Sequence, residues 1–232
     1  MRPGVKIELN EAARLTMESL KTGSTVIDRI LGGGVRSGAL TQVYGSSSSG
    51  KTQLGLQTAV LAASSGASAL VLDTEGSFRP ERAAEIATAR GLEPGPVLER
   101  ITYVRSATSA EQVEVVRRLA RGGEGGPKLV VVDTVTKNFT LDYPGRENAP
   151  LRQAELGTHM SEMARDAFLN SRAYLLANRV ASSPSGENFV GGAAIEQTVE
   201  TSLRLSREGD RVRVDSASGG SGVTSIGAAG IY

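Results

Sequence analysis

Gly45-Ser46-Ser47-Ser48-Ser49-Gly50-Lys51-Thr52 is the stretch of sequence that decides the fold. It matches the P-loop pattern, in which two glycines separated by four residues are followed by Lys and then Ser or Thr. The apolar run over residues 39–44 predicts a strand, and the pattern over residues 52–63 predicts a helix. Because a P-loop requires a strand before it and a helix after it, we interpret the stretch as a phosphate-binding loop and not as a flexible Gly/Ser turn.

The residue types in this loop suit a triphosphate. Backbone N–H groups can wrap the phosphates, and the start of the following helix adds positive potential. Lys51 is expected to reach the β and γ phosphates, and the Thr52 hydroxyl to bind Mg²⁺. The predicted nucleotide-binding residues are Gly45, Ser46, Ser47, Ser48, Ser49, Gly50, Lys51 and Thr52, with ATP and Mg²⁺ as the predicted cofactors.

Two acidic residues follow predicted strands. Asp133 closes the run Val130-Val131-Val132, a position from which a carboxylate can hold Mg²⁺ through water. Glu75 follows the predicted strand over residues 68–73 and is expected beside the P-loop, where it would polarise the attacking water. Glu75 and Lys51 are therefore the predicted catalytic residues. The alternative for each acid is an exposed turn residue.

The rest of the chain repeats a short apolar run, a turn and an amphipathic helix, which is typical of an α/β fold. Further strands are predicted over 101–105, 128–133 and 174–180, with helices from Pro80, from Ser109 and over residues 151–170. Residues 181–194 are interpreted as a functional loop or a linker, and residues 201–207 and 211–215 as an antiparallel hairpin. We expect a polar lead-in over residues 1–20 and one domain over residues 21–232, with a mostly parallel central sheet flanked by helices.

Two details of the predicted helices can be checked. Ser109 and Gln112 are predicted to form a capping box at a helix start. One face of the helix over residues 151–170 is predicted to be core, and its members are Leu156, Met160, Met163, Ala167 and Phe168.

The composition excludes several classes of protein. The 26 Lys and Arg residues nearly balance the 25 Asp and Glu residues, so any contact with nucleic acid must come from a local patch. Cysteine is absent, which excludes disulfides and thiolate metal sites. No apolar run approaches the roughly 18 residues of a membrane span. A cytoplasmic protein without membrane contact is expected.

Three segments together resemble the core of RecA-like strand-exchange proteins, in the archaeal and eukaryotic branch. They are residues 40–53, 73–82 and 129–134. The resemblance implies a RecA-like P-loop NTPase fold. This chain begins too late to hold the N-terminal DNA-binding domain of the full-length proteins, and such a core-only layout is similar to that of the archaeal RadB paralogues.

The resemblance also implies roles for residues. Asp133 would be the Walker B acid, Glu75 the water-activating carboxylate, and Arg82 would lie near the adenine. Family members usually end the fifth strand with Asn-Gln, where the glutamine senses the γ-phosphate, whereas here Asn178 precedes Arg179. Arg179 is a candidate nucleotide sensor, and the alternative is an ion pair with a surface acid.

In the family, DNA runs along two segments that match residues 142–152 and 181–194 here. Arg146 and Arg152 are candidate phosphate contacts in the first segment. Phe189, in the second, would stack on a base or fold back on its own loop. We expect modest, salt-sensitive affinity for single-stranded DNA. Four arginines of the C-terminal hairpin would either extend this surface or lie on a solvated sheet face: Arg204, Arg207, Arg211 and Arg213.

The expected function is that of a recombinase paralogue or mediator in DNA recombination and repair, with weak or DNA-dependent ATPase activity. Its expected partners are single-stranded DNA, a recombinase or another repair protein, and further copies of itself. One alternative is an adaptor that binds ATP without hydrolysing it. Another is a KaiC-like regulatory ATPase, which the Phe78-Arg79-Pro80 context fits less well.

Overall fold

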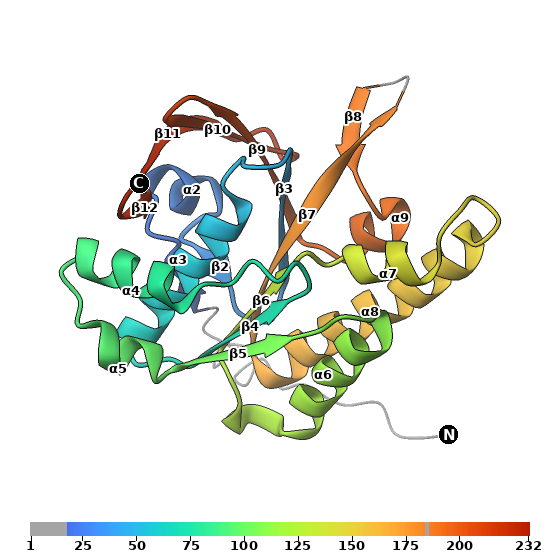
Figure 1. Cartoon of the computed structure of the whole chain (residues 1–232), viewed down its shortest axis with the longest axis horizontal. Helices are drawn as coiled ribbons and strands as arrows, with labels where there is room; N and C mark the ends of the chain where they lie inside the picture. The colour runs from blue at the N-terminus through green and yellow to red at the C-terminus, as the bar shows by residue number, and fades with distance from the viewer. Residues whose placement is uncertain (1–17, 184–185) are drawn as a thin grey trace, which may run out of the picture.

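The structure is a computed structural model that describes residues 18–183 and 186–232 (Figure 1). The strands are β1 (Ser19–Leu20), β2 (Val35–Arg36), β3 (Leu40–Gly45), β4 (Ala69–Asp73), β5 (Ile101–Arg105), β6 (Leu129–Asp133), β7 (Ala173–Ser183), β8 (Gly186–Phe189), β9 (Thr201–Glu208), β10 (Arg211–Ser216), β11 (Ser221–Gly227) and β12 (Gly230–Ile231). The helices are α2 (Thr25–Ile30), α3 (Lys51–Ser64), α4 (Pro80–Ala89), α5 (Pro94–Leu98), α6 (Ser109–Arg121), α7 (Lys137–Asp142), α8 (Ala149–Asn170) and α9 (Gly192–Glu196), with a short 3₁₀ helix, η1 (Gly123–Gly125). None of the helices in these ranges is long and apolar enough to cross a bilayer.

The large sheet has the strand order β12-β11-β10-β9-β3-β7-β6-β4-β5. Its pairs from β9 through β3, β7, β6 and β4 to β5 are parallel, whereas β9 to β12 pair antiparallel. The predicted fold class is therefore confirmed. The antiparallel part is longer than the predicted hairpin, because β11 and β12 continue it.

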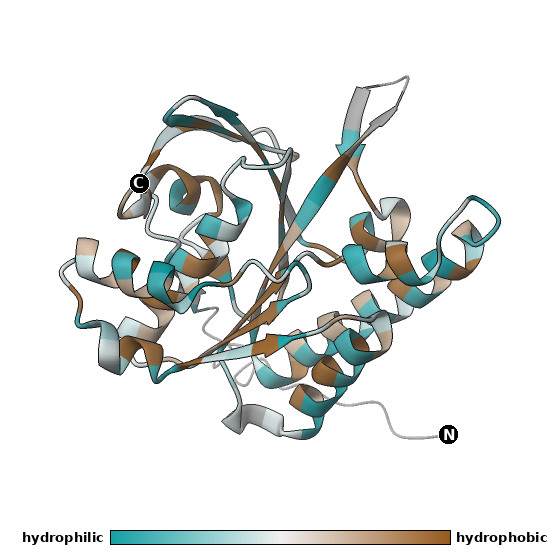
Figure 2. Ribbon diagram, viewed as in Figure 1, coloured by the Kyte–Doolittle hydropathy of each residue, from teal (hydrophilic) through white to brown (hydrophobic). Residues whose placement is uncertain are grey.

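Helices cover both faces of the sheet (Figure 1). The side chains of β6 alternate, so that Leu129 and Val131 pack in the core with α3, and Val130 and Val132 pack in the core with α6, α7 and α8. A third apolar cluster joins α3 to α4 and α5. Figure 2 shows the resulting contrast between hydrophobic central strands and hydrophilic outer helix faces. Burial on both faces explains why these strands read as continuous apolar runs.

Two predicted helix features are wrong in detail. The capping box of α6 is formed by Thr108 and Glu111, one residue before the predicted pair, and Ser109 is instead the first helical residue. In α8 the residues predicted to be core are buried except for Phe168, whose exposed fraction is 55%. Phe168 lies about 100° around the helix from Ala167, beyond the apolar stripe.

The segment over residues 181–194 is not the loop that its composition suggested. Strand β7 continues to Ser183 and pairs antiparallel with β8, with Val180 opposite Phe189, and α9 follows. Hairpin pairing gives these backbone groups partners that an open loop would leave to water. The predicted lead-in lies largely outside the described residues, although Ser19 and Leu20 form β1 and pair with β2.

The single histidine is structural. His159 of α8 is fully buried, its Nε2 accepts a hydrogen bond of 3.2 Å from Gln112 Nε2, and its ring lies 5.4 Å from that of Phe139. Among the described residues no group of three or more acids and histidines could hold a metal ion, so His159 is not part of such a site. Burial lowers the pKa of His159 to about 3.

This burial predicts a pH dependence of stability. Between pH 6.5 and about 3 the unfolded chain binds a proton at His159 that the folded chain does not. The free energy of unfolding should therefore fall as the pH falls below 6.5, by about 1.4 kcal/mol per pH unit from this residue. Urea unfolding at pH 7 and pH 5 measures the fall, which should be about 2 kcal/mol smaller in His159→Phe. Equal losses in the two proteins would contradict the assignment.

Candidate functional site

The P-loop joins the end of β3 to the start of α3. Gly50 has φ 106°, and a Cβ there would lie 3.0 Å from Ile231 Cδ1. A Cβ on Gly45 would collide with the backbone oxygen of Leu205 on β9. Both positions therefore need glycine. No side chain caps the start of α3, so the amide groups of its first turn are available to an anion.

Lys51 lies inside this loop. Its Nζ donates hydrogen bonds to the oxygens of Gly45 (2.9 Å) and Ser46 (2.6 Å) and to Ser49 Oγ (3.2 Å). Burial lowers the pKa of the ammonium group, an effect that the nearby charge of Asp133 opposes. The positive charge thus sits where an anion in the loop would meet it.

Thr52 and Asp133 meet as the sequence predicts. The Thr52 hydroxyl donates a hydrogen bond of 2.6 Å to Asp133 Oδ2. The Asp133 side chain is buried, which raises the pKa of its carboxyl group, and the charges of Asp73 and Glu75 add to the rise. Within residues 18–183 and 186–232 no Lys or Arg forms an ion pair with it. A buried acid without a direct ion-pair partner, beside a hydroxyl, fits a divalent cation.

Glu75 follows β4 and faces the same edge of the sheet. Lys137 Nζ lies 3.0 Å from Glu75 Oε2, and Arg179 forms an ion pair with Glu75 Oε1. Burial acts to raise the pKa of Glu75, but the hydrogen bonds from Lys137 and Arg179 outweigh it and the pKa is lowered. Arg179 does form an ion pair, but its partner is Glu75, the predicted water-activating residue, and not a surface acid.

Asp73 is a positioning residue that the sequence analysis missed. Its Oδ1 accepts the backbone N–H groups of Glu75 and Gly76 (both 2.8 Å), and its Oδ2 accepts that of Phe78 (3.0 Å). These bonds fix the turn that carries Glu75. An aspartate that bonds to amides a few residues ahead is a known turn signal, so this role was open to prediction.

Two cavities meet at the P-loop, of about 420 and 460 Å³, within the size range of ligand pockets. Ser48, Lys51, Thr52, Ser77 and Asp133 line both. The first extends to residues that the P-loop pattern does not include: Gln53, Phe78, Arg82, Arg207 and Ile226. The second is bordered by Ser46, Ser47, Glu75, Thr134 and Arg179.

Two arginines of the first cavity hold different positions. Arg82 Nε donates to Gln53 Oε1 at 3.0 Å, so its guanidinium is fixed beside α3. Arg207, grouped above with the hairpin arginines, reaches the P-loop, where its guanidinium lies 3.4 Å from the oxygen of Ser48. No motif pointed to Arg207, because strand β9 approaches the loop only in the folded sheet.

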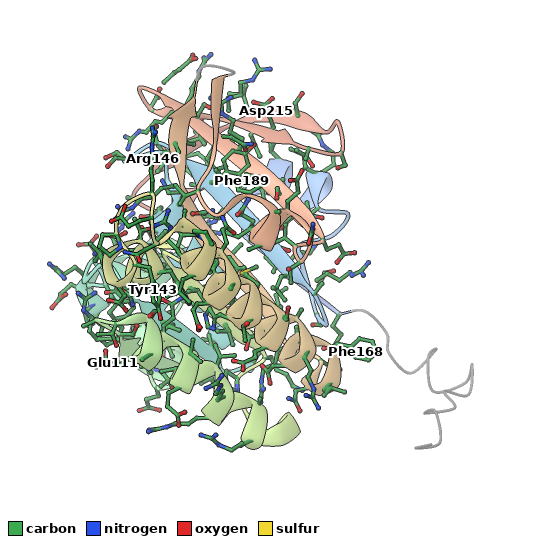
Figure 3. The ribbon with its side chains drawn as sticks, turned by 90° about the vertical axis from the view of Figure 1, so that its right-hand side faces the viewer. Glu111, Tyr143, Arg146, Phe168, Phe189 and Asp215 are labelled. Atoms are coloured by element: carbon green, nitrogen blue, oxygen red, sulfur yellow. The ribbon has the colours of Figure 1, made fainter. Side chains whose placement is uncertain are left out.

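Two of the candidate DNA contacts, Arg146 and Phe189, lie on the face that carries α7, α8 and β8 (Figure 3). Arg146 is exposed on the loop between α7 and α8. The guanidinium of Arg152 donates hydrogen bonds to the backbone oxygens of Tyr143 and Gly145 in the same loop, so it is already engaged within the protein. Phe189 is half-buried, and its ring packs edge-to-face on Tyr44 with centroids 5.3 Å apart. Tyr44 belongs to β3, so Phe189 packs against the central sheet and not on its own segment.

Comparison with known proteins agrees with this geometry. A family model described as Rad51 matches residues 13–219, which include every candidate residue. The chain belongs to the Rad51 family. Among its Rad51-family relatives, the DNA repair and recombination protein RadA of Metallosphaera sedula is 37% identical over 182 residues, 75% of this chain and 56% of that protein.

Two more archaeal relatives have the same name. RadA of Ignicoccus hospitalis is 36% identical over 183 residues, which are 74% of this chain and 56% of the relative. RadA of Aeropyrum pernix is 35% identical over 195 residues, which are 79% of this chain and 61% of the relative. The chain thus spans little more than half the length of these curated Rad51-family proteins.

Asp73→Ala should loosen the turn that carries Glu75. Each amide loses a hydrogen bond to a charged acceptor, worth about 1.5–3 kcal/mol. Hydrogen exchange at the amides of Glu75, Gly76 and Phe78 should speed up by about tenfold or more where local opening governs exchange. Amides in α8 serve as the internal control, and unchanged exchange in the turn would contradict the role of Asp73.

Proposed function

We propose that this Rad51-family chain binds ATP with Mg²⁺, hydrolyses it slowly, and acts in DNA recombination or repair. The observation that carries the proposal is the hydrogen bond from Thr52 to the buried Asp133 directly beneath an uncapped P-loop. That arrangement brings amide donors, an ammonium group and a carboxylate to one point, as phosphate and metal binding require.

The roles of the residues follow from their places. Amides of residues 45–52 receive the phosphates, and Lys51 exchanges its bonds to Gly45 and Ser46 for phosphate oxygens. Thr52 and Asp133 would hold Mg²⁺, and the bound ion would supply positive charge to the phosphates. Glu75 accepts a hydrogen bond from the attacking water and so orients and polarises it. Arg82 provides a flat cation near the base.

A second function has an observation in its favour. Glu75 is engaged by Lys137 and Arg179, and a carboxylate in two ion pairs is a weak base. An adaptor that binds ATP without hydrolysing it would need nothing more than the P-loop and Asp133. The KaiC-like alternative is disfavoured, because the family match is to Rad51.

The DNA part of the proposal rests on the family and on one exposed cation. The relatives are named for DNA repair and recombination. We propose single-stranded DNA as a ligand, with Arg146 as the leading phosphate contact. Arg152 stabilises the loop that carries Arg146. Phe189 is a lesser candidate for base stacking. A recombinase or other repair protein, or another copy of the chain, is the proposed protein partner, as for a paralogue of the RadB type.

Two variants test the nucleotide site. Lys51→Ala should weaken ATP binding by about tenfold to a hundredfold, since it removes charge-assisted hydrogen bonds. Glu75→Gln should retain binding while turnover falls by about 10² or more. Calorimetry with Mg²⁺ and nucleotide, together with phosphate release, measures both. Absence of turnover in the unmodified protein, with binding intact, would favour the adaptor.

Arg146→Ala tests the DNA contact. It should weaken binding to labelled single strands of any sequence, and reduce the slope of log K against log salt by about 0.7. Fluorescence anisotropy at several salt concentrations measures the slope. Arg118→Ala, an exposed arginine whose side chain is 75% accessible on α6, is the matched control. If both variants bind as the unmodified protein does, Arg146 is not a contact.

A further inference from the structure

Glu75 lies between two cationic side chains, Lys137 and Arg179, which differ in their exposure to solvent. Lys137 bonds one carboxylate oxygen and also donates to the oxygen of Thr74 at 3.1 Å, and its side chain is 21% exposed. Arg179 pairs with the other oxygen, but its side chain is 51% exposed. Lys137 is therefore the fixed partner of Glu75, and Arg179 is the partner that solvent or a ligand can reach.

Arg179 is also placed to meet a phosphate. In the parallel pairing of β3 with β7 it lies directly opposite Gly45, the first residue of the P-loop. It borders the same cavity as Ser46, Lys51 and Thr52. The geometry of a guanidinium group suits phosphate oxygens as well as carboxylate oxygens. The last phosphate group of a bound triphosphate would therefore compete with Glu75 for the guanidinium of Arg179.

We propose that Lys137, Glu75 and Arg179 form an element that distinguishes a nucleoside triphosphate from a diphosphate, a proposal that rests on the proposed function. Without nucleotide, Glu75 holds Arg179. When a triphosphate binds, its third phosphate forms an ion pair with Arg179 in place of Glu75. One oxygen of Glu75 then becomes free to accept a hydrogen bond from water. Lys137 keeps the carboxylate in place throughout, and is a positioning residue.

The exchange predicts a specific binding pattern. Glu75→Gln releases Arg179, so Mg²⁺ with a non-hydrolysable ATP analogue should bind about fivefold more tightly, as expected for loss of a competing half-exposed ion pair. Binding of ADP should change less than about twofold. In the Arg179→Gln background, Glu75→Gln should have no further effect on the ratio of the two affinities. Glu81→Gln, the same change of charge on an exposed residue of α4, is the control.

Calorimetry on the four members of this double-mutant cycle separates the outcomes. If Glu75→Gln strengthens both nucleotides equally, or if its effect persists without Arg179, simple charge repulsion explains it and the exchange is overturned. If neither nucleotide binds the unmodified protein, the proposed function fails together with the exchange.

Lys137 has its own test. Lys137→Met should lower kcat for ATP about tenfold or more with little change in KM, since it misplaces Glu75 without touching the phosphates. Lys137→Arg should restore part of kcat. An unchanged kcat in Lys137→Met, or a loss that Lys137→Arg does not rescue at all, would overturn the positioning role.

Discussion

Parallel pairing of β3, β7, β6 and β4 is the constraint on which the site depends. In that register Gly45 lies opposite Arg179, and Asp133 lies opposite both Ala177 and Asp73. Because parallel strands end at the same edge, residues separated by more than a hundred positions in the chain arrive at one cavity without any long loop. The P-loop amides supply the fixed positive end of this cavity, and the strand ends supply its acids.

Charge at the site is balanced by contacts within the protein. Lys51 bonds the oxygens of its own loop, and Lys137 and Arg179 bond Glu75, so each cation has an acceptor in the described structure. Asp133 accepts a hydrogen bond from the Thr52 hydroxyl, and within the described residues no Lys or Arg forms an ion pair with it. A ligand that binds here therefore has to supply a cation for Asp133. It also has to supply negatively charged oxygens that take the place of the present acceptors of Lys51 and Arg179. Magnesium with a polyphosphate satisfies both requirements.

Much of this site could be predicted because its chemistry is local in sequence. The P-loop carries its own pattern, and Asp133 and Glu75 follow apolar runs that end at the same edge of the sheet. The role of Lys137 could not be predicted in the same way. Lys137 begins a short helix, and its role follows only from its contact with Glu75 in the folded protein. The hairpin of β7 and β8 was misread because Ser, Gly and Asn are turn residues by composition, whereas register pairing is a tertiary property.

Asn178 links the P-loop edge of the sheet to the β7–β8 hairpin and to the residue that precedes α7. Its Nδ2 donates to the oxygen of Val190 at the base of the β7–β8 hairpin and to Gln42, and its Oδ1 accepts from Thr136 just before α7. Since Asn178 is fully buried and Arg179 is its neighbour, a movement of the Arg179 backbone would have to break these bonds, whereas a movement of its half-exposed side chain would not. The proposed exchange of Arg179 between carboxylate and phosphate therefore needs only a rotamer change, and the hydrogen bonds of Asn178 to Thr136 and Val190 can stay intact while it occurs.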